Sequence, residues 1–298
     1  MQKYDFGQIA NSVINGAVLT RAERLEGGVS ADVFRLDIEH PDGQAQQVVL
    51  RVHGETHGGH SAALEYTLLR AVRAQGLPVP EPLFVDSGGD LLGFPAVVIA
   101  FVEGQSGVPD ELGKDCVLPM ARMLKRIHQP VATDFPELPV RLNPLPELFE
   151  FFPEEPEWKD LETYLRGLEV ADYPGQHCLL HGDFWPENIL WQNAEIAAVL
   201  DWEDAAVGDP LSDLASARVE LRYLFGKPVM DRFAQAYAGT SELDLERLAL
   251  WQIYVAAAAD RYMGQWRLPP ERESRMRREA RASIREAGSY LLGASDQL

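Results

Sequence analysis

The sequence predicts an α+β protein of two lobes, in which a small lobe built on an antiparallel sheet precedes a larger, mainly helical lobe. Strand patterns with one helix fill roughly the first hundred residues, and helical spacing dominates from Glu103-Gly104 onward. The length of 298 residues suits two modest domains or one large one. We therefore expect an N-terminal lobe over residues 1–103 and a C-terminal lobe over residues 104–298.

The N-terminal lobe should contain a hairpin. Phe34, Leu36 and Ile38 alternate with charged residues, as in a strand with one buried face. Pro41-Asp42-Gly43 is a turn sequence, and the apolar run 48–52 supplies the second strand.

A helix and two further strands complete this lobe. Leucines recur at helical spacing over residues 64–72, and Gly76 and Pro78 end that helix. Residues 83–85 and 96–102 then form strands around a glycine-rich turn.

The C-terminal lobe is mainly helical. Residues 117–127 form an amphipathic helix and residues 245–263 form a longer one. Residues 179–200 return briefly to short strands. The proline-rich, acidic residues 144–163 are expected to wrap the surface, and residues 261–285 are basic, with eight Arg and three Glu.

Charge is the unusual feature of the composition. Lys plus Arg number 27 and Asp plus Glu number 46, which gives a net charge of −19. Such a field repels phosphate polymers and argues against nonspecific binding to nucleic acid or to anionic membranes. It suits a cationic substrate, although solubility alone also explains it.

Two cysteines, Cys116 and Cys178, cannot form a disulfide framework and fit a reducing compartment. The first residues lack the basic and apolar regions of a signal peptide. The apolar run 96–102 is too short to span a membrane. We expect a soluble, cytoplasmic protein.

The stretch that carries chemistry lies in the centre of the chain. Asp183 precedes Asn188 by five residues, and Asp201 follows Asn188 by thirteen. The apolar segments 189–191 and 196–200 can pair as a hairpin, which would bring Asn188 and Asp201 together at its open end. Ordinary turn chemistry is the alternative for each of these residues taken alone.

Oxygen ligands of this kind suit a hard cation such as Mg²⁺. Asp201 and Asn188 would hold the metal, and Asp183 would supply a third oxygen group nearby. Phosphoryl transfer needs such a set, because a metal neutralises phosphate charge while a separate carboxylate orients the attacking hydroxyl and accepts its proton.

These residues resemble a known family, the aminoglycoside phosphotransferase and choline kinase-like group, whose fold is similar to that of protein kinases. HGDFWPENIL, at residues 181–190, resembles its catalytic loop, and LDWEDAAVGDPLSDLA, at residues 200–215, resembles its metal-binding segment and the following helix. The resemblance implies ATP and Mg²⁺ as cofactors, Asp183 as the catalytic base, and Asn188 and Asp201 as metal ligands. It runs from about Leu25 to Ala215.

The N-terminal lobe offers candidates for binding the nucleotide. Gly27, Gly28 and Ser30 lie between two strand patterns, where exposed backbone amides can bind phosphates, although a plain hairpin turn is the alternative. The glycine run of protein kinases is absent. Val33 and Val49 share a strand face and could cover an adenine or simply form core.

Arg51 resembles the strand cation that contacts the nucleotide phosphates, where protein kinases use Lys. Glu65 on the next helix would be its ion-pair partner, with two ordinary surface residues as the alternative. The connector containing Ala100 and Val102 resembles the hinge between the lobes, whose backbone could hydrogen-bond adenine.

Four further residues are assigned supporting roles. His128 ends the helix 117–127, and His181 braces the catalytic loop. Asp209 is expected as the N-cap of a helix that begins at Pro210, with Asp213 in its first turn.

A histidine cluster, His53, His57 and His60, has a spacing that could bind zinc or nickel. Because it is rich in glycine and lies between a strand and a helix, we favour a mobile, solvated segment over the nucleotide site.

The sequence therefore predicts an ATP- and Mg²⁺-dependent kinase that phosphorylates a hydroxyl of a small molecule. The alternatives are a non-catalytic nucleotide-binding protein of the same fold and, less favoured, a metal-dependent hydrolase. The sequence specifies neither the acceptor nor the oligomeric state.

An amine-bearing acceptor is one hypothesis. Glu203 and Asp204 follow the metal ligand, and exposed acids there would attract an ammonium group. Trp158 and Trp185 could stack on it. Five further acids precede the catalytic loop: Glu147, Glu150, Glu154, Glu155 and Glu157.

Overall fold

The computed structural model describes residues 4–25, 31–54, 58–129, 135–266 and 268–295, which fall into two compact units. The first, called the sheet unit, comprises residues 1–107, 133–137 and 189–204. The second, called the helical unit, comprises residues 108–132, 138–188 and 205–298. The chain therefore leaves the sheet unit after residue 107, contributes residues 133–137 to it, and returns to it again at residue 189.

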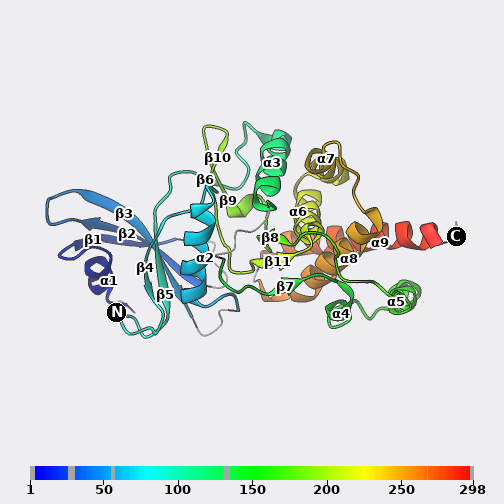
Figure 1. Cartoon of the computed structure of the whole chain (residues 1–298), viewed down its shortest axis with the longest axis horizontal. Coiled ribbons are helices and arrows are strands. Elements are labelled where there is room, and N and C mark those ends of the chain that lie inside the picture. Colours follow the sequence, from blue (N-terminus) through cyan, green and yellow to red (C-terminus); the bar gives the residue numbers. More distant parts are fainter. Residues whose placement is uncertain (1–3, 26–30, 55–57, 130–134, 267, 296–298) are drawn as a thin grey trace. The chain divides into compact units, whose positions relative to one another are not determined.

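The sheet unit contains a five-stranded antiparallel sheet in the order β1-β2-β3-β5-β4 (Figure 1). The strands are β1 (Val18–Arg24), β2 (Ala31–Glu39), β3 (Ala45–His53), β4 (Pro82–Asp86) and β5 (Ala96–Ala100).

The predicted hairpin is confirmed as β2 and β3, with Leu36 opposite Val48. Gly43 has a φ of 84°, which a residue with a side chain adopts only with strain, and this explains the glycine at the turn. Leu36, Ile38 and Leu50 face a core completed by α1 (Phe6–Val13).

The predicted helix of the sheet unit is α2 (Ala62–Ala74), which packs against β4 and β5 (Figure 1). Its N-cap is Ser61, whose side chain accepts a hydrogen bond from the amide of Leu64. The chain turns at Gly76, with a φ of 77°.

A small second sheet in this unit has the order β10-β9-β6, formed by β6 (Gln105–Ser106), β9 (Ile189–Gln192) and β10 (Glu195–Val199). The predicted hairpin at residues 189–200 is thereby confirmed. Asn193 and Ala194 connect its strands with φ angles of 52° and 63°, the pattern of a type I′ turn.

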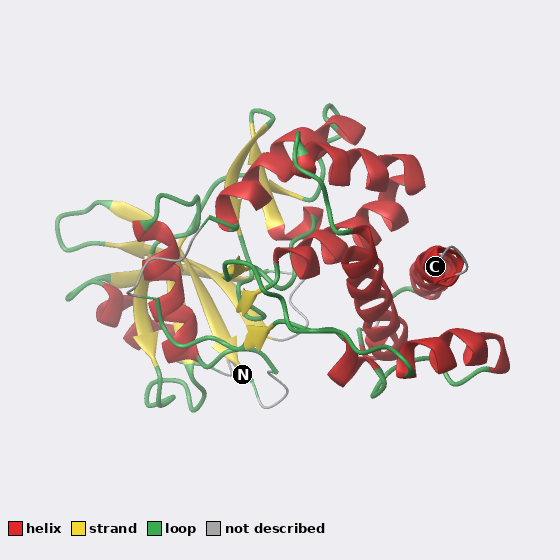
Figure 2. Cartoon of the chain, turned by 45° about the vertical axis from the view of Figure 1, so that its right-hand side comes forward, coloured by secondary structure: helices red, strands yellow, loops and turns green. Residues whose placement is uncertain are grey.

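Helices make up most of the regular structure of the helical unit (Figure 2). The α-helices are α3 (Val117–Ile127), α4 (Leu145–Leu148), α5 (Lys159–Arg166), α6 (Pro210–Phe225), α7 (Lys227–Ala238), α8 (Leu245–Tyr262) and α9 (Pro270–Ser295). Its short strands are β7 (Val140–Arg141), β8 (Cys178–Leu180) and β11 (Ala206–Gly208), and its 3₁₀ turns are Gly113–Cys116, Pro156–Trp158, Pro186–Asn188 and Met263–Gln265.

The predicted helices over residues 117–127 and 245–263 are confirmed as α3 and α8. The expectation that residues 144–163 wrap the surface holds for their acidic side chains, most of which are exposed, but not for their apolar ones. Leu148 is fully buried and Phe152 is 7% exposed, because the apolar side chains of this stretch pack into the core formed with α8 and α9.

The basic helix α9 is matched by acidic partners within the helical unit. Arg281 pairs with Glu155 at 2.7 Å and with Asp260 at 3.0 Å, and Arg285 pairs with Glu157 at 3.6 Å. The arginines of α9 thus offset the acidic stretch that precedes the catalytic loop. Among the residues described, no helix is long and apolar enough to cross a membrane.

Candidate active site

Arg51 is the centre of a charged group in the sheet unit. It lies on β3 with its side chain only 12% exposed, on the face opposite the core because Leu50 and Val52 point inward. Its guanidinium is 2.9 Å from Asp201 Oδ1, 3.3 Å from Glu203 Oε2 and 3.1 Å from Glu65 Oε1. The ion pair expected with Glu65 is present.

Glu65 serves two partners. It is 2% exposed on α2, and besides Arg51 it lies 2.8 Å from His53 Nε2. A buried carboxylate of this kind requires such partners. Burial by itself lowers the pKa of Arg51, but Glu65, Asp201 and Glu203 together raise it above its usual value, so this side chain is a permanent cation.

The end of the β9–β10 hairpin fixes Asp201. The amide of Val199 donates to Pro78 O at 2.8 Å, and Trp202 Nε1 donates back to Val199 O at 3.2 Å. Asp201 itself has a φ of 61°, a left-handed conformation uncommon for a residue with a side chain. Such conformations are concentrated at functional sites, because the surrounding structure must hold them in place.

The chain before α2 approaches Glu203 closely. His60 N donates to Glu203 O at 3.1 Å, and a Cβ atom added at Gly59 would lie 2.6 Å from Glu203 Cβ. Gly59 is therefore required for this close approach.

In the helical unit, the catalytic loop places Asn188 against Asp183. The Asn188 side-chain amide Nδ2 donates to Asp183 Oδ2 at 2.8 Å and to Asp183 O at 2.9 Å. These two bonds orient the amide nitrogen towards Asp183, so its oxygen points elsewhere and is available to a cation.

Asp213 fixes the backbone at the start of the loop through hydrogen bonds. Its carboxylate accepts the amides of His181 at 2.6 Å and Gly182 at 2.9 Å, and it is 1% exposed. The amide of Asp183 in turn donates to His181 Nδ1 at 3.2 Å. These contacts give His181 and Asp213 the supporting geometry expected of them.

His128 connects Asp213 to α7. Its Nε2 is 3.1 Å from Asp213 Oδ2 and its Nδ1 is 2.7 Å from the hydroxyl of Tyr237. Burial alone would raise the pKa of Asp213, but the hydrogen bonds and charge of His128 and His181 hold it below its usual value. Asp213 therefore remains an acceptor for the loop amides.

Asp209 is confirmed as the N-cap of α6, since its carboxylate accepts the amide of Leu211 at 2.9 Å and Pro210 follows it. The same fully buried carboxylate accepts Trp251 Nε1 at 2.7 Å and the guanidinium of Arg247. This network ties the start of α6 to α8.

The structure describes only some of the residues that the sequence predicts to bind the nucleotide. Val33 lies opposite Arg51 in the register of β2 and β3, so Val33, Val49 and Arg51 share a face as expected. The amide of Ala100 donates to Glu81 O at 2.8 Å, and Val102 follows β5 and is partly buried. Gly27, Gly28 and Ser30 lie outside the described residues.

The histidine cluster is not assembled as a metal site in the part of the chain that the structure describes. No group of three His, Cys, Asp or Glu residues there is arranged to hold a metal. His53 is engaged with Glu65, and His57 lies outside the described residues.

Three residues near the catalytic loop were not found from the sequence: Glu187, Glu220 and Arg272. Arg272 of α9 pairs with Glu187 of the loop at 2.8 Å. Burial, followed by the charges of Asp183 and Glu187, raises the pKa of Glu220 to about 8. The sequence offers little indication of Glu220. The one hint is that this acidic residue stands between two apolar residues, Val219 and Leu221, which the structure shows to be buried.

Three of the seven acids proposed to attract an amine form ion pairs, among them Glu157 with Arg285. Glu203 contacts Arg51, and Glu155 contacts Arg281. The expectation that Trp158 stacks on an acceptor is wrong, because its ring is 3% exposed and lies beneath the guanidinium of Arg285 at 5.5 Å.

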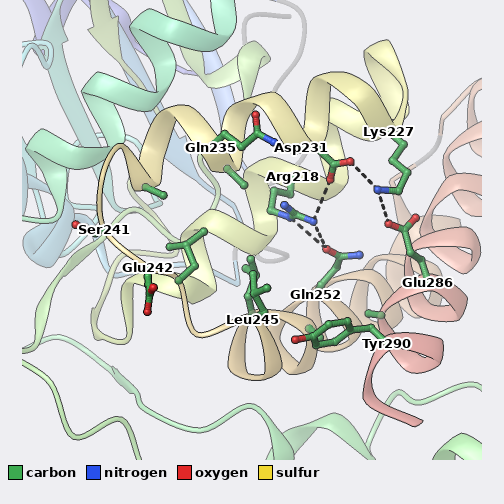
Figure 3. Close-up of a pocket in the computed structure, with 16 residues that line it drawn as sticks. Arg218, Lys227, Asp231, Gln235, Ser241, Glu242, Leu245, Gln252, Glu286 and Tyr290 are labelled. Carbon is green, nitrogen blue, oxygen red and sulfur yellow. Dashed lines mark hydrogen bonds and ion pairs between the residues drawn. The ribbon is translucent and has the colours of Figure 1, made fainter. Parts of the chain in front are cut away.

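A pocket of about 840 Å³ lies among α6, α7, α8 and α9 of the helical unit (Figure 3). None of the predicted site residues lines it. One wall of the pocket is a network of polar side chains. In this network Arg218 contacts Gln252 and Asp231. Lys227 contacts Asp231 and Glu286. The pocket is therefore separate from the candidate site.

The buried strand arginine of the sheet unit and the contact between Asp183 and Asn188 in the helical unit agree with the kinase-like phosphotransferase pattern that the sequence resembles. The chain belongs to the phosphotransferase enzyme family, whose profile matches residues 21–251. The predicted family is thereby confirmed.

Solved structures agree in fold. A protein of Ralstonia eutropha, provisionally described as an aminoglycoside phosphotransferase, is 15% identical, with a TM-score of 0.70 over 97% of this chain and 99% of that one. A thermostable mutant of aminoglycoside phosphotransferase APH(4)-Ia, in a ternary complex with AMP-PNP and hygromycin B, is 16% identical, with a TM-score of 0.63 over 95% and 98%. A choline/ethanolamine kinase family protein from Mesorhizobium loti is 18% identical, with a TM-score of 0.61 over 90% and 87%.

Curated relatives are closer in sequence but much longer. Acyl-CoA dehydrogenase family member 11 of Gallus gallus is 27% identical over 209 residues, which are 59% of this chain and 25% of that protein. The protein of the same name in Rattus norvegicus is 26% identical over 179 residues, 52% of this chain and 22% of that protein. The chain spans about a quarter of the length of these relatives.

Proposed function

We propose that this protein transfers the γ-phosphate of ATP to a hydroxyl group of a small molecule in the presence of Mg²⁺. The observation that carries the proposal is the contact of the Asn188 amide with the Asp183 carboxylate at 2.8 Å, on a loop whose backbone Asp213 holds. In this reaction Asp183 accepts the proton of the acceptor hydroxyl. The hydroxyl oxygen forms a bond to the γ-phosphorus as the bond to the leaving ADP oxygen breaks.

Two residues fit Mg²⁺ by their donor chemistry. Asp201 offers a carboxylate, and the Asn188 amide has its nitrogen committed to Asp183 and its oxygen available. Both are the oxygen donors that Mg²⁺ prefers. Bound Mg²⁺ would neutralise charge on the outer phosphates.

The nucleotide would be bound by the sheet unit. Arg51, a permanent cation ion-paired with Glu65, would contact the phosphates. Gly27, Gly28 and Ser30 would supply backbone amides. Val33 and Val49 would contact the adenine through their apolar side chains. The connector that begins at Ala100 and contains Val102 would hydrogen-bond the adenine through backbone groups other than the Ala100 amide, which donates to Glu81 O.

The acceptor proposed first is an amine-bearing alcohol. Hygromycin B is bound in one structural neighbour, and another belongs to the choline/ethanolamine kinase family. A second candidate is the hydroxyl of an acyl thioester, favoured because the curated relatives are acyl-CoA dehydrogenase family members. A screen of ADP release should include both classes.

The base is tested by Asp183→Asn. Because the positioned base is lost while the loop contacts stay similar, we expect turnover to fall about 100-fold or more with little change in ATP affinity. Asp110→Asn, at an exposed position of the same unit, is the matched control. Turnover of Asp183→Asn at the wild-type rate would remove Asp183 from this role.

The metal is tested by Asp201→Ala and by chelation. Loss of the carboxylate should weaken Mg²⁺-dependent ATP binding and abolish transfer, as should excess EDTA. Isothermal titration with and without Mg²⁺ measures the first effect. ATP binding that is equally strong in the variant and without metal would contradict the assignment.

The same measurements separate the alternative functions. A non-catalytic binding protein would bind ATP with Mg²⁺ but release no ADP with any acceptor. A metal-dependent hydrolase would cleave phosphoesters without using ATP.

A further inference from the structure

Tyr237 of α7 begins a chain of hydrogen bonds that ends at the catalytic loop. Its hydroxyl lies 2.7 Å from His128 Nδ1, and His128 Nε2 lies 3.1 Å from Asp213 Oδ2. The same Oδ2 accepts the amide of His181 at 2.6 Å, and Oδ1 accepts the amide of Gly182 at 2.9 Å. Every member of this chain belongs to the helical unit. Tyr237 is thereby linked, through two side chains, to the backbone just before the proposed base.

Packing fixes the position of the Tyr237 hydroxyl. The residue is 9% exposed on α7, and its ring meets the His128 ring edge to face, with the ring centres 5.6 Å apart. Lys125 of α3 lies 5.9 Å from the centre of the Tyr237 ring and donates to Ala238 O at 3.3 Å. The helices α3 and α7 lie side by side (Figure 1). The hydroxyl therefore has little freedom to turn away from His128.

The donors and acceptors along the chain fix where the protons lie. Asp213 is an ionised carboxylate and can only accept, so His128 Nε2 must carry a proton. Burial raises the pKa of Tyr237, so its hydroxyl keeps a proton to donate. Among the described residues, His128 Nδ1 is the only hydrogen-bond partner of that hydroxyl, and it accepts this proton. His128 is therefore held at both nitrogens, in the tautomer with hydrogen on Nε2.

We propose that Tyr237 is a positioning residue for the catalytic loop and acts on Asp183 through His128. The inference rests on the proposed function, in which Asp183 is the base, and deepens it. A partner at one nitrogen of a histidine orients the ring and selects which nitrogen carries the proton. The donated bond also strengthens the bond from Nε2 to Asp213, because hydrogen bonds in a buried chain polarise one another.

Loss of the hydroxyl should therefore reach the loop. The His128 side chain is 4% exposed, so without Tyr237 its Nδ1 would be buried with no donor among the described residues. An unsatisfied buried acceptor costs free energy, and the ring would be free to turn away from Asp213. Asp213 would then hold the loop amides without its own support.

This chain of contacts can be tested in the protein without any acceptor. With ¹⁵N-labelled histidine, the His128 ring signals are assigned by their loss in His128→Gln. We expect hydrogen on Nε2 and none on Nδ1 in the wild type, and a shifted Nδ1 signal in Tyr237→Phe because its donor is gone. The amides of His181 and Gly182 should exchange with solvent about fivefold faster in Tyr237→Phe, as expected for one lost hydrogen bond. Tyr290→Phe, at a 44% exposed position of α9, should change neither.

Hydrogen on His128 Nδ1 in the wild type, or an Nδ1 signal that Tyr237→Phe leaves unchanged, would overturn the proposal. Unchanged exchange of the two loop amides would also overturn it. Absence of ADP release with every acceptor would instead contradict the proposed function and leave these signals readable. The two failures are therefore distinguishable.

Kinetics separate positioning from a purely stabilising role. With an acceptor that is phosphorylated, Tyr237→Phe should lower kcat about fivefold or more well below its melting temperature, with unchanged KM values for ATP and acceptor. Because the hydroxyl acts through His128, the double variant Tyr237→Phe/His128→Gln should turn over at the rate of His128→Gln alone. Losses that add fully in the double variant, or a wild-type kcat in Tyr237→Phe, would contradict the role.

Discussion

At the scale of single residues, the environment of Glu220 makes stability depend on pH. Its pKa is about 8 in the folded protein against an ordinary value of 4.5, with burial as the main cause. Between these values the folded state binds more protons than the unfolded state, so the free energy of unfolding falls as pH rises. Below pH 4.5 this loss is absent, and above about pH 8 it is complete.

Replacement by glutamine removes this dependence. We expect Glu220→Gln to melt several degrees above the wild type at pH 8.5, with the difference shrinking steadily towards pH 4.5. Thermal melting across this range, with Glu279→Gln as control, measures it. Melting curves that differ equally at every pH would show that the carboxyl does not titrate in this way.

The predictability of the site also differs residue by residue. Asp183, Asn188 and Asp201 could be proposed from the sequence because one short motif places Asn188 and Asp201 at the two ends of a hairpin, with Asp183 just before it. Glu220 and Arg272 could not, because they come from α6 and α9. Nothing in the local sequence of a helix tells which distant loop a given side chain meets.

At the scale of elements, the turn between β9 and β10 has a conformation that its second residue, Ala194, does not favour. A type I′ turn favours Asn followed by Gly, but here Ala194 occupies the second position with a φ of 63°. The left-handed conformation costs a residue with a side chain about 1–2 kcal/mol. The turn therefore holds strain at the closed end of the hairpin, and Asp201 follows the opposite end of β10.

We expect Ala194→Gly to stabilise the protein by about 0.5–1 kcal/mol, after allowance for the greater flexibility of glycine in the unfolded chain. Ala194→Val, which tolerates this φ poorly, should destabilise it. Urea denaturation of both variants provides the comparison. A destabilising effect of Ala194→Gly would show that the alanine side chain makes a contact worth more than the strain.

Helices and strands were predicted correctly where the sequence combined a clear hydrophobic periodicity with a residue that ends the element. The β2–β3 hairpin has alternation and Gly43, and α2 has helical spacing and Gly76. Prediction succeeded only in part at residues 144–163, where prolines and acids indicated a surface segment and the acids are indeed exposed. The apolar residues among them lacked a clear period, yet Leu148 and Phe152 are buried.

At the scale of the whole molecule, the net charge of −19 already includes the arginines of α9, so the protein carries a large excess of negative charge. The resulting field should attract an amine-bearing acceptor over a Debye length of about 8 Å at physiological ionic strength. We expect the KM of such an acceptor to rise between 0.05 and 0.5 M salt, roughly in step with the screening of that field. Steady-state assays with an uncharged analogue as control test this, and a salt-independent KM for the amine would exclude long-range attraction.

The interrupted course of the chain has a consequence for synthesis on the ribosome. The sheet unit takes its β9–β10 hairpin from residues 189–204, well after its first 107 residues. At about 5–20 residues per second, the nascent sheet must wait on the order of 5–20 s before that hairpin emerges. During this interval β6 lacks its partner strand β9. The N-terminal segment is thus a candidate client for chaperones that protect unpaired strands, and slower translation of residues 108–188 should lengthen its exposure.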